Sequence, residues 1–350
     1  SDLFSQQDIQ FQGAIAINTE ILKTILNVIG PIELPKYNKT IDSKNFLKEV
    51  QYEVEAGQDK KTGENPKRIL SALTPLIFEK LKNLSPEGKN NLAVGLKNHF
   101  EQKDVLIYFK DWKLQNFIES MGLGGEVFDL PKNFQGDYLA IVSANIAGGK
   151  SDAFISQHID LKSEIQPDGK IQNNLTITRI HDGQNEKEWW YRSPNKSYIK
   201  IFSPINSQLI NAAGNDSPIL SNKSLINYLK DGYDYDIDLE SIEGSSSFLS
   251  PFKTWLGKES GKNYFGLWLT VPAGTTKTLK INYSSGISFN LKDGAIFQFV
   301  FDKQSGSNSS LEYSISAPPG YIWKESGKNT FEYGTQNIKA REIISLTLKT

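Results

Sequence analysis

The hydrophobic positions in the first third of the chain alternate between helical stripes and short apolar runs. Apolar residues recur at helical spacing from Ile21 to Ile29, behind an N-cap at Asn18 or Thr19, and Gly30 ends this predicted helix. The pattern predicts further helices over 69–84, 86–100 and 111–121, and strands over 11–17, 32–34, 105–109 and 138–142. Ser85 and Asp111 are the expected N-caps of the last two helices. Their expected inward faces are formed by Leu92, Leu96 and Phe100 and by Leu114, Phe117, Ile118 and Met121. Because strands separated by helices are typical of a sheet with helices packed on it, we expect an α+β domain over residues 1–147.

Beyond Gly148 the hydrophobic period changes to two. Apolar residues alternate along 264–271, 279–283, 297–301, 311–315 and 346–348, with Gly and Pro turns between them. Asp168-Gly169 predicts a hairpin between the strands near 159–161 and 175–177, and one amphipathic helix is expected from Leu220 to Leu229. Short alternating strands at this spacing predict an all-β, immunoglobulin-like sandwich over residues 153–350.

Composition narrows the function classes. The formal net charge of −1 offers no field for nucleic acid, and the absence of cysteine excludes disulfides and thiolate chemistry. No apolar run reaches the roughly 20 residues that span a bilayer. Since the sequence starts at Ser1 and not at Met, two explanations stay open: removal of a signal or anchor segment from a precursor, or a trimmed chain.

The segment from Asn145 to Asp152 contains Gly148-Gly149-Lys150-Ser151, which invites comparison with a phosphate-binding loop. The Walker pattern requires a glycine where Ala144 stands, so nucleotide binding is disfavoured. The favoured interpretation is a joint between the two domains, with glycines in a sharp turn and the side chains of Asn145 and Asp152 bound to backbone. A weak ligand site formed by Asn145, Lys150 and Asp152 is the alternative.

Trp189, Trp190 and Arg192 form an aromatic and basic cluster with two interpretations. Exposed aromatic rings beside polar groups can stack on sugars, which makes these three residues candidates for glycan binding. The favoured interpretation is that Trp189 or Tyr191 fills the sandwich core while its neighbours cover the rim.

Acidic residues and histidines were considered as metal ligands. Asp234, Asp236 and Asp238 are weak calcium candidates, but their alternation more simply indicates the wet face of an edge strand. None of the three histidines, His99, His158 and His181, has a second histidine or acid at ligand spacing, so we expect no metal centre and no cofactor.

The chain resembles the bacterial Domain of Unknown Function 4012 family. The matching segments are Gly13–Asn18, Ile29–Ile32, Asp104–Phe109, Tyr138–Val142, Asn145–Asp152, Tyr198–Pro204 and Phe265–Gly274. The resemblance covers nearly the whole chain, and Asn145–Asp152 is its most specific part. It implies a protein on the extracellular face of the envelope, membrane-anchored in its full-length form, and it supplies no reaction.

The passage from Phe11 to Leu34 is more distantly similar to the LytR-CpsA-Psr proteins, which transfer glycopolymers from a polyprenyl pyrophosphate to the cell wall. Those enzymes hold the pyrophosphate with arginines and an aspartate. Between Ile32 and Lys110 this sequence has Arg68 as its one arginine, on a predicted helix, so the arginine-rich motif has no counterpart.

Three functions remain from the sequence. The leading hypothesis is a non-enzymatic cell-surface protein with a structural, adhesion or assembly role, whose partners are cell-wall glycan or other envelope proteins. The second is a fragment of an envelope glycopolymer-processing enzyme, which would require a cleft lined by arginine and acidic side chains. The third is a glycan-binding module that uses Trp189 and Trp190.

Overall fold

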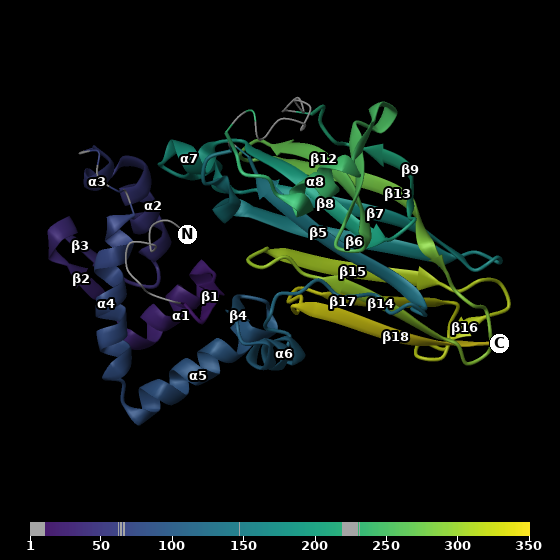
Figure 1. Ribbon diagram of the computed structural model, residues 1–350, viewed down its shortest axis with the longest axis horizontal. Helices are drawn as coiled ribbons and strands as arrows, with labels where there is room; N and C mark the ends of the chain where they lie inside the picture. The colour runs from purple at the N-terminus through teal and green to yellow at the C-terminus, as the bar shows by residue number, and fades with distance from the viewer. Residues whose placement is uncertain are drawn as a thin grey trace. The chain divides into compact units, whose positions relative to one another are not determined.

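The computed structural model describes residues 11–61, 63, 65, 67–146, 148–218, 230 and 232–350. The chain divides into two compact units, Ser1–Glu126 and Val127–Thr350. Helices dominate the first unit and strands the second, so the chain as a whole is α+β with strands in the majority (Figure 1). The helix predicted from Leu220 to Leu229 lies outside the described residues.

The first unit is built from helices and two small antiparallel sheets. Its strands pair as β1 with β4 and β2 with β3. Its elements are β1 (Gly13–Ile17), α1 (Thr19–Ile29), β2 (Ile32–Leu34), β3 (Lys39–Ile41), α2 (Phe46–Ala56), α3 (Gln58–Lys61), α4 (Arg68–Lys82), α5 (Pro86–Glu101), β4 (Val105–Phe109) and α6 (Trp112–Ser120).

Side-chain caps start the helices where the sequence predicts them. Asn18 accepts from the backbone N–H of Glu20 at the start of α1, and Ser85 accepts from Gly88 at the start of α5. Asp111 accepts from two N–H groups at the start of α6. The core of this unit gathers apolar residues of α1, α2 and α4 over the β2–β3 hairpin, among them Leu26, Ile41, Phe46, Ile69 and Leu73.

The predicted inward faces of α5 and α6 are largely not buried. Phe100 of α5 is exposed, and of the four α6 residues expected inside, Ile118 is buried while Leu114, Phe117 and Met121 are exposed. The physical reason is the size of the sheet beside α6. The β1–β4 pair has two strands, too few to cover the apolar face of a helix.

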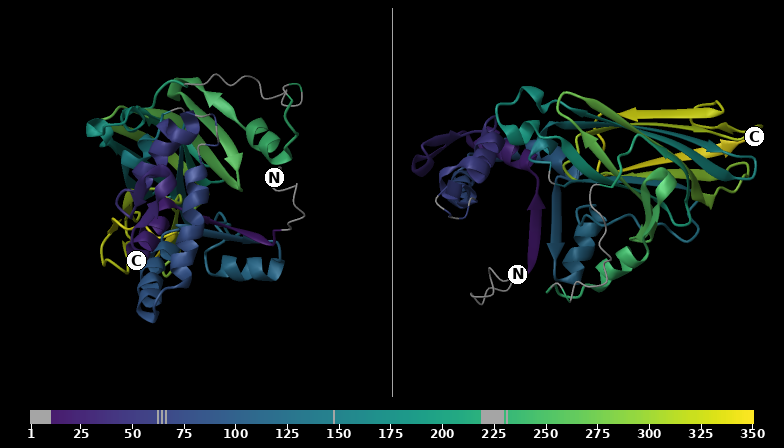
Figure 2. Two further views of the ribbon diagram at one scale, coloured as in Figure 1. Left: turned by 90° about the vertical axis from the view of Figure 1, so that its left-hand side faces the viewer. Right: turned by 90° about the horizontal axis from the view of Figure 1, so that it is seen from above.

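The second unit consists mainly of two large sheets. The eight-stranded sheet has the order β10 (Ser247–Leu249), β11 (Thr254–Glu259), β12 (Lys262–Val271), β8 (Asn195–Pro204), β5 (Gly136–Asn145), β14 (Ile296–Asp302), β18 (Arg341–Lys349) and β16 (Ile322–Trp323). The six-stranded sheet has the order β17 (Thr330–Thr335), β15 (Ser309–Ser316), β6 (Ile155–Ile165), β7 (Lys170–His181), β13 (Thr276–Ser288) and β9 (Gln208–Ala213). Figure 2 shows the long strands of this unit running broadly along one direction.

One hydrophobic core joins the two sheets. Leu139, Ile201 and Phe299 from the eight-stranded sheet share a cluster with Leu161 and Ile281 from the six-stranded sheet. The predicted hairpin at Asp168-Gly169 is confirmed, because β6 and β7 pair antiparallel from Ile155↔His181 to Ile165↔Ile171. Both sheets are mixed, since β5 pairs parallel with β14 and β6 pairs parallel with β15.

The division between the units differs from the sequence expectation, which placed it between 147 and 153. The strand predicted at 138–142 was assigned to the sheet of the first domain. In the structure it is the central part of β5, which lies between β8 and β14 in the eight-stranded sheet. The segment Asn145–Asp152 therefore connects two strands of the same unit and is not a joint between units.

None of the helices in the described part of the chain has the length and apolar character needed to cross a membrane.

Candidate functional site

The inward-facing rows of the β-rich unit change from apolar to polar at one end. In β7 the buried row runs through Leu175 and Ile177 and continues with Arg179 and His181. In β8 the row of Ile201 and Ile199 continues with Ser197 and Asn195, both fully buried.

Strand register brings the polar ends of neighbouring rows together. Gln157 of β6 lies opposite Arg179 of β7 on one side and opposite Ser309 of β15 on the other. Residues paired directly across a sheet point to the same face, so these three side chains form one polar row.

Two of the connections between the sheets lie at this same end. The chain passes from β5 to β6 and again from β14 to β15, each time from the eight-stranded to the six-stranded sheet. Because β5 and β14 are parallel neighbours, and β6 and β15 are too, both connections leave the same end of one sheet and enter the same end of the other.

A recess of about 230 Å³ opens between these elements. The residues that line it are mostly polar: Ser143, Asp152, Ile155, Gln157, Arg179, Gln304, Ser305, Gly306, Ser307, Asn308 and Ser309. The sequence had singled out Asp152, and the structure places it beside Arg179.

Asn195 holds the inner wall of the recess in place. Its Nδ2 donates to Asp152 Oδ1 at 2.8 Å and to Ser151 Oγ at 3.2 Å. Its Oδ1 accepts from Ser197 Oγ at 2.7 Å and, weakly, from Arg179 Nη2 at 3.4 Å. Asn195 thereby fixes Asp152 and Arg179 relative to each other.

Arg179 is the unusual member of the site. It is 3% exposed, and its Nε and Nη1 have no hydrogen-bond partner. Burial lowers the pKa of the guanidinium below its ordinary value, and the carboxylate of Asp152 acts in the opposite direction. The guanidinium of arginine keeps its charge in proteins, so a buried cation lies in the wall of the recess, with its Nε and Nη1 covered by the surrounding protein.

Gln304 forms part of the outer wall of the recess. Its Oε1 accepts from the N–H of Ser143 at 2.9 Å, and its Nε2 donates to the carbonyl of the same residue at 2.9 Å. This two-point contact ties the β14–β15 connection to β5 and keeps the recess open to a defined width.

The turn chemistry predicted for Asn145 is present. Asn145 Oδ1 accepts from Lys196 N–H at 3.2 Å, and its Nδ2 donates to the carbonyl of Gly148 at 3.3 Å. A Cβ at Gly148 would lie 2.0 Å from Asn145 Oδ1, and Gly149 has φ +63, so glycine is required at both positions. Asn145 shapes the loop that carries Asp152, while Lys150 is outside the lining of the recess.

The aromatic cluster occupies a short helix, α7 (Trp189–Arg192), that packs on this loop. The backbone N–H of Lys150 donates to the carbonyl of Trp190 at 2.9 Å. Trp190 and Tyr191 are buried, whereas Trp189 is 62% exposed and Arg192 is also exposed. The pair expected to stack on sugars is thus divided, and Trp189 alone keeps an accessible ring.

The acidic stretch forms a helix and not an edge strand. Asp236 is the N-cap of α8 (Ile237–Gly244), where its side chain accepts from the N–H of Leu239, and Asp238 lies in the first turn. Asp234 precedes the cap. Across the described residues, no group of three His, Cys, Asp or Glu side chains is arranged to hold a metal ion.

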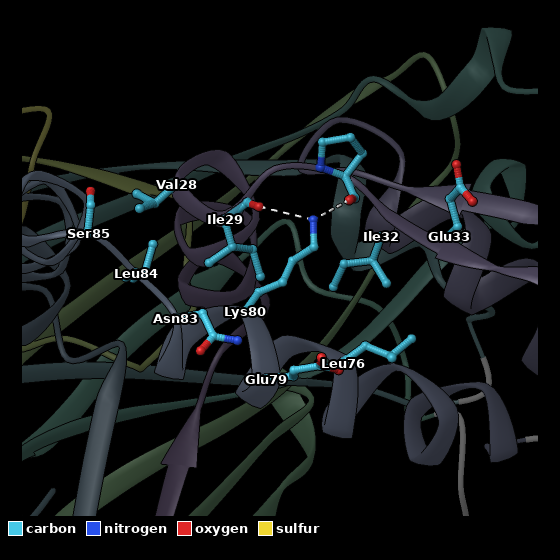
Figure 3. Close-up of a pocket in the computed structure, with 11 residues that line it drawn as sticks. Val28, Ile29, Ile32, Glu33, Leu76, Glu79, Lys80, Asn83, Leu84 and Ser85 are labelled. Carbon is cyan, nitrogen blue, oxygen red and sulfur yellow. Dashed lines mark hydrogen bonds between the residues drawn. The ribbon is translucent and has the colours of Figure 1, made fainter.

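A second recess, of about 650 Å³, lies in the first unit between α1, β2 and α4 (Figure 3). Lys80 extends across it and donates to the carbonyls of Ile29 and Pro31 at 3.2 and 2.8 Å. Glu33 and Glu79 line it, but its lining residues include no arginine. It lacks the arginine grip that the glycopolymer-transfer hypothesis requires.

The first unit also contains a chain of polar side chains that the sequence analysis did not identify. Thr24 Oγ1 lies 2.8 Å from His99 Nε2, and His99 Nδ1 lies 2.7 Å from Asp104 Oδ2. Thr24 is on α1 and His99 on α5, and a Cβ at Gly95 of α5 would lie 2.8 Å from the methyl carbon of Thr24. These polar side chains therefore lie where α1 and α5 pack closely, and their contacts stabilise that packing.

Arg179 belongs to no sequence motif, and its only signal in the sequence is that it interrupts a buried apolar row. The signal was present: in the series Leu175, Ile177, Arg179, a cation occupies a position that period two assigns to the interior.

Comparisons with known proteins give distant likenesses. No protein-family model and no curated protein matches the chain. Among solved structures, a candidate nutrient binding protein from Legionella pneumophila has a TM-score of 0.33 at 10% identity, over 62% of this chain and 72% of that one. An M1 zinc metallopeptidase from Deinococcus radiodurans has a TM-score of 0.28 at 11% identity, over 56% of this chain and 42% of the peptidase. Likeness at this level does not establish a common fold.

Proposed function

We propose that this chain is a non-enzymatic binding protein of the bacterial cell surface, whose β-rich unit holds a polar ligand in the recess at Arg179. The observation that carries the proposal is the buried guanidinium of Arg179 in the wall of a recess that is otherwise lined mostly by polar groups. Its positive charge favours a ligand that offers hydrogen-bond acceptors or negative charge.

The surroundings of Arg179 support binding in preference to chemistry. Asn195, Gln304 and Asn145 use their side chains to fix backbone and neighbouring side chains, which produces a rigid, preformed site. Hydroxyl and amide groups form most of the remaining lining, and these groups recognise ligands without activating them.

The cell-surface location and the glycan or protein partners rest on the resemblance to the Domain of Unknown Function 4012 family. The immunoglobulin-like class of the β-rich unit is part of the same proposal. Two sheets that share one core support it. The eight and six strands and the parallel pairs β5–β14 and β6–β15 extend beyond the usual seven to nine antiparallel strands of that class.

Co-sedimentation of the full chain with bacterial sacculi that retain their attached glycopolymers tests the proposal. We expect saturable binding that Arg179→Gln weakens and Arg68→Gln, an exposed arginine of the first unit, does not. We also expect that no soluble sugar or phosphate is released during the incubation. Binding that is indifferent to Arg179→Gln, or steady release of soluble product, would contradict the proposal.

A further inference from the structure

The first unit contains a strand whose outer edge is open. β1 pairs with β4 on one side, and these two strands form a sheet of their own (Figure 1). The other edge of β4 is taken, since the N–H of Ile107 donates to the carbonyl of Leu123 at 2.9 Å. Within the described part of the chain, no strand pairs with the outer edge of β1. Further strands can therefore join this sheet only at β1.

The register of β1 shows which backbone groups face the open edge. The N–H of Lys110 donates to the carbonyl of Gln12 at 2.8 Å, and the N–H of Asn18 donates to the carbonyl of Asp104 at 3.1 Å. The even-numbered residues of β1 thus direct their backbone groups toward β4. Because this direction alternates along a strand, the N–H and C=O groups of the odd-numbered residues 13, 15 and 17 point to the open edge.

β1 also lacks the features that protect edge strands from pairing. Its sequence, Gly-Ala-Ile-Ala-Ile, contains no charged residue and no proline. In the two large sheets, by contrast, the edge strands β10 and β16 are three and two residues long, β17 carries Glu332, and β9 pairs with a shifted register. The outer edge of β1 is neutral, regular and apolar, which favours the addition of another strand.

The side chains beside this edge are apolar and exposed. Ile15 is 67% exposed and Ile17 is 45% exposed. The helix α6 packs on β4, and a sheet of two strands is too narrow to cover its apolar side chains. The exposed apolar side chains of β1, β4 and α6 are Ile15, Ile17, Tyr108, Trp112, Leu114, Phe117 and Met121.

The area of these side chains approaches what a stable dimer requires. Tyr108, Trp112 and Phe117 are 54%, 66% and 61% exposed, and an aromatic side chain carries about 150–250 Å², so these three alone offer roughly 350 Å² per copy. The aliphatic side chains of the same surface raise this area toward the roughly 800 Å² that each partner of a standard interface buries.

The open edge is complementary to itself. In an antiparallel pair centred on Ile15, this residue lies opposite its own copy, and Gly13 lies opposite Ile17. The residues that meet are the same odd-numbered residues whose N–H and C=O groups point outward, so these backbone groups find partners in both copies. A surface that pairs with itself in this way satisfies the two-fold symmetry of a homodimer.

We infer that β1 is a homodimer contact, in which two copies of the chain pair antiparallel through Ile15 and form one four-stranded sheet in the order β4–β1–β1–β4. A second copy is the favoured occupant because the strand complements itself in register and carries no charge that would select an oppositely charged segment. The inference does not depend on the recess at Arg179.

Analytical ultracentrifugation of the full chain over a concentration series tests the inference. We expect a reversible monomer–dimer equilibrium. Ile15→Lys places two like charges opposite each other on the symmetry axis and should weaken dimerisation about tenfold or more. The matched control is Ile343→Lys, because Ile343 is 52% exposed but lies in β18, which has a strand on either side; this variant should dimerise as the wild type does.

Single cysteines test the register, since the chain has no cysteine of its own. With Ile15→Cys the two thiols face each other across a hydrogen-bonded pair, where the Cα atoms lie about 5.5 Å apart, within disulfide range. With Ile17→Cys the two thiols are separated by four residues along the strands, roughly 14 Å, which a disulfide does not span. Mild oxidation should therefore yield a covalent dimer of Ile15→Cys and not of Ile17→Cys.

Three results would overturn the inference. A chain that stays monomeric throughout the concentration series would leave the edge of β1 for a strand of another protein. A dimer that Ile15→Lys does not weaken would use another surface. Cross-linking of Ile17→Cys in preference to Ile15→Cys would exclude this register. If Ile15→Lys fails to fold, the wild-type concentration series and the two cysteine variants still decide.

Discussion

At the residue scale, Asp137 is a fully buried acid, and ionisation of its carboxyl group opposes folding. Its carboxylate is fully buried and accepts from Asn173 Nδ2 at 2.5 Å, from the N–H of Tyr138 at 2.9 Å and from Ser285 Oγ at 2.9 Å. Burial raises the pKa of Asp137 from 3.8 to about 6, and the three hydrogen bonds lower it only in part.

The pKa of Asp137 predicts how stability depends on pH. Below pH 3.8 the carboxyl group of Asp137 is protonated in both the folded and the unfolded chain, so its full contribution to the free energy of unfolding is present. As pH rises from 3.8 to about 6 the unfolded chain ionises first, so the wild type loses about 3 kcal/mol relative to Asp137→Asn. Urea unfolding of both proteins at pH 4 and pH 7 should show about 2 kcal/mol of this difference, since part of the loss has already occurred at pH 4, and parallel pH profiles would refute it.

Truncation of two neighbouring tryptophans is predicted to lower the free energy of unfolding by very different amounts. Trp190 is 3% exposed and packs edge-on against Tyr191, so Trp190→Ala should destabilise the β-rich unit by about 3–5 kcal/mol. Trp189 is 62% exposed, so Trp189→Ala should cost less than about 1 kcal/mol. Chemical denaturation of the two variants provides the comparison. Equal losses would show that the assignment of buried and exposed rings is wrong.

At the element scale, the contact between α1 and α5 depends on the chain Thr24–His99–Asp104. Thr24→Val keeps the shape of the side chain but leaves His99 Nε2 without its partner, and should destabilise the first unit by roughly 1–3 kcal/mol. Thr74→Val is the matched control, because Thr74 is an exposed helical threonine that bonds only to Leu70 of its own helix. Equal effects of the two substitutions on the unfolding midpoint would argue against this stabilising role.

The sequence predicted local structure better than it predicted which strands pair with one another. The caps at Asn18, Ser85 and Asp111 lie where expected because capping is decided within a few residues. The strand at 138–142 was also expected, but its sheet was not, since pairing with β8 and β14 joins residues far apart in the chain. Period-two patterning determines which side chains point inward, but it does not determine which strand lies next to it in the sheet.

The residues of the candidate site show the same difference between local features, which the sequence predicts, and long-range contacts, which it does not. Asn145 binds backbone as expected because turn chemistry is local, whereas the carboxylate of Asp152 accepts from the side chain of Asn195 in another strand. Arg179 acquires its meaning from strands β6, β8 and β15, which bring Gln157, Asn195 and Ser309 beside it. The acidic residues near Asp236 followed an alternating pattern but formed a helix, because the side chain of Asp236 caps its first turn.

At the scale of the whole molecule, the two units have separate cores and should unfold separately. Differential scanning calorimetry of the full chain is expected to show two transitions. Thr24→Val should lower one of them and Trp190→Ala the other. A single transition that both substitutions shift would show that the units unfold as one.

The central claim is that Arg179 meets the ligand directly, and its side-chain Nε–H signal reports on that contact. The arginines of the chain are Arg68, Arg179, Arg192 and Arg341, and Arg179→Lys identifies the Arg179 signal in a ¹H–¹⁵N spectrum. Titration with soluble glycopolymer fragments released from the sacculi is predicted to shift this signal saturably while the Arg68 signal stays in place. An Arg179 signal that does not move as the fragments are added would contradict the claim.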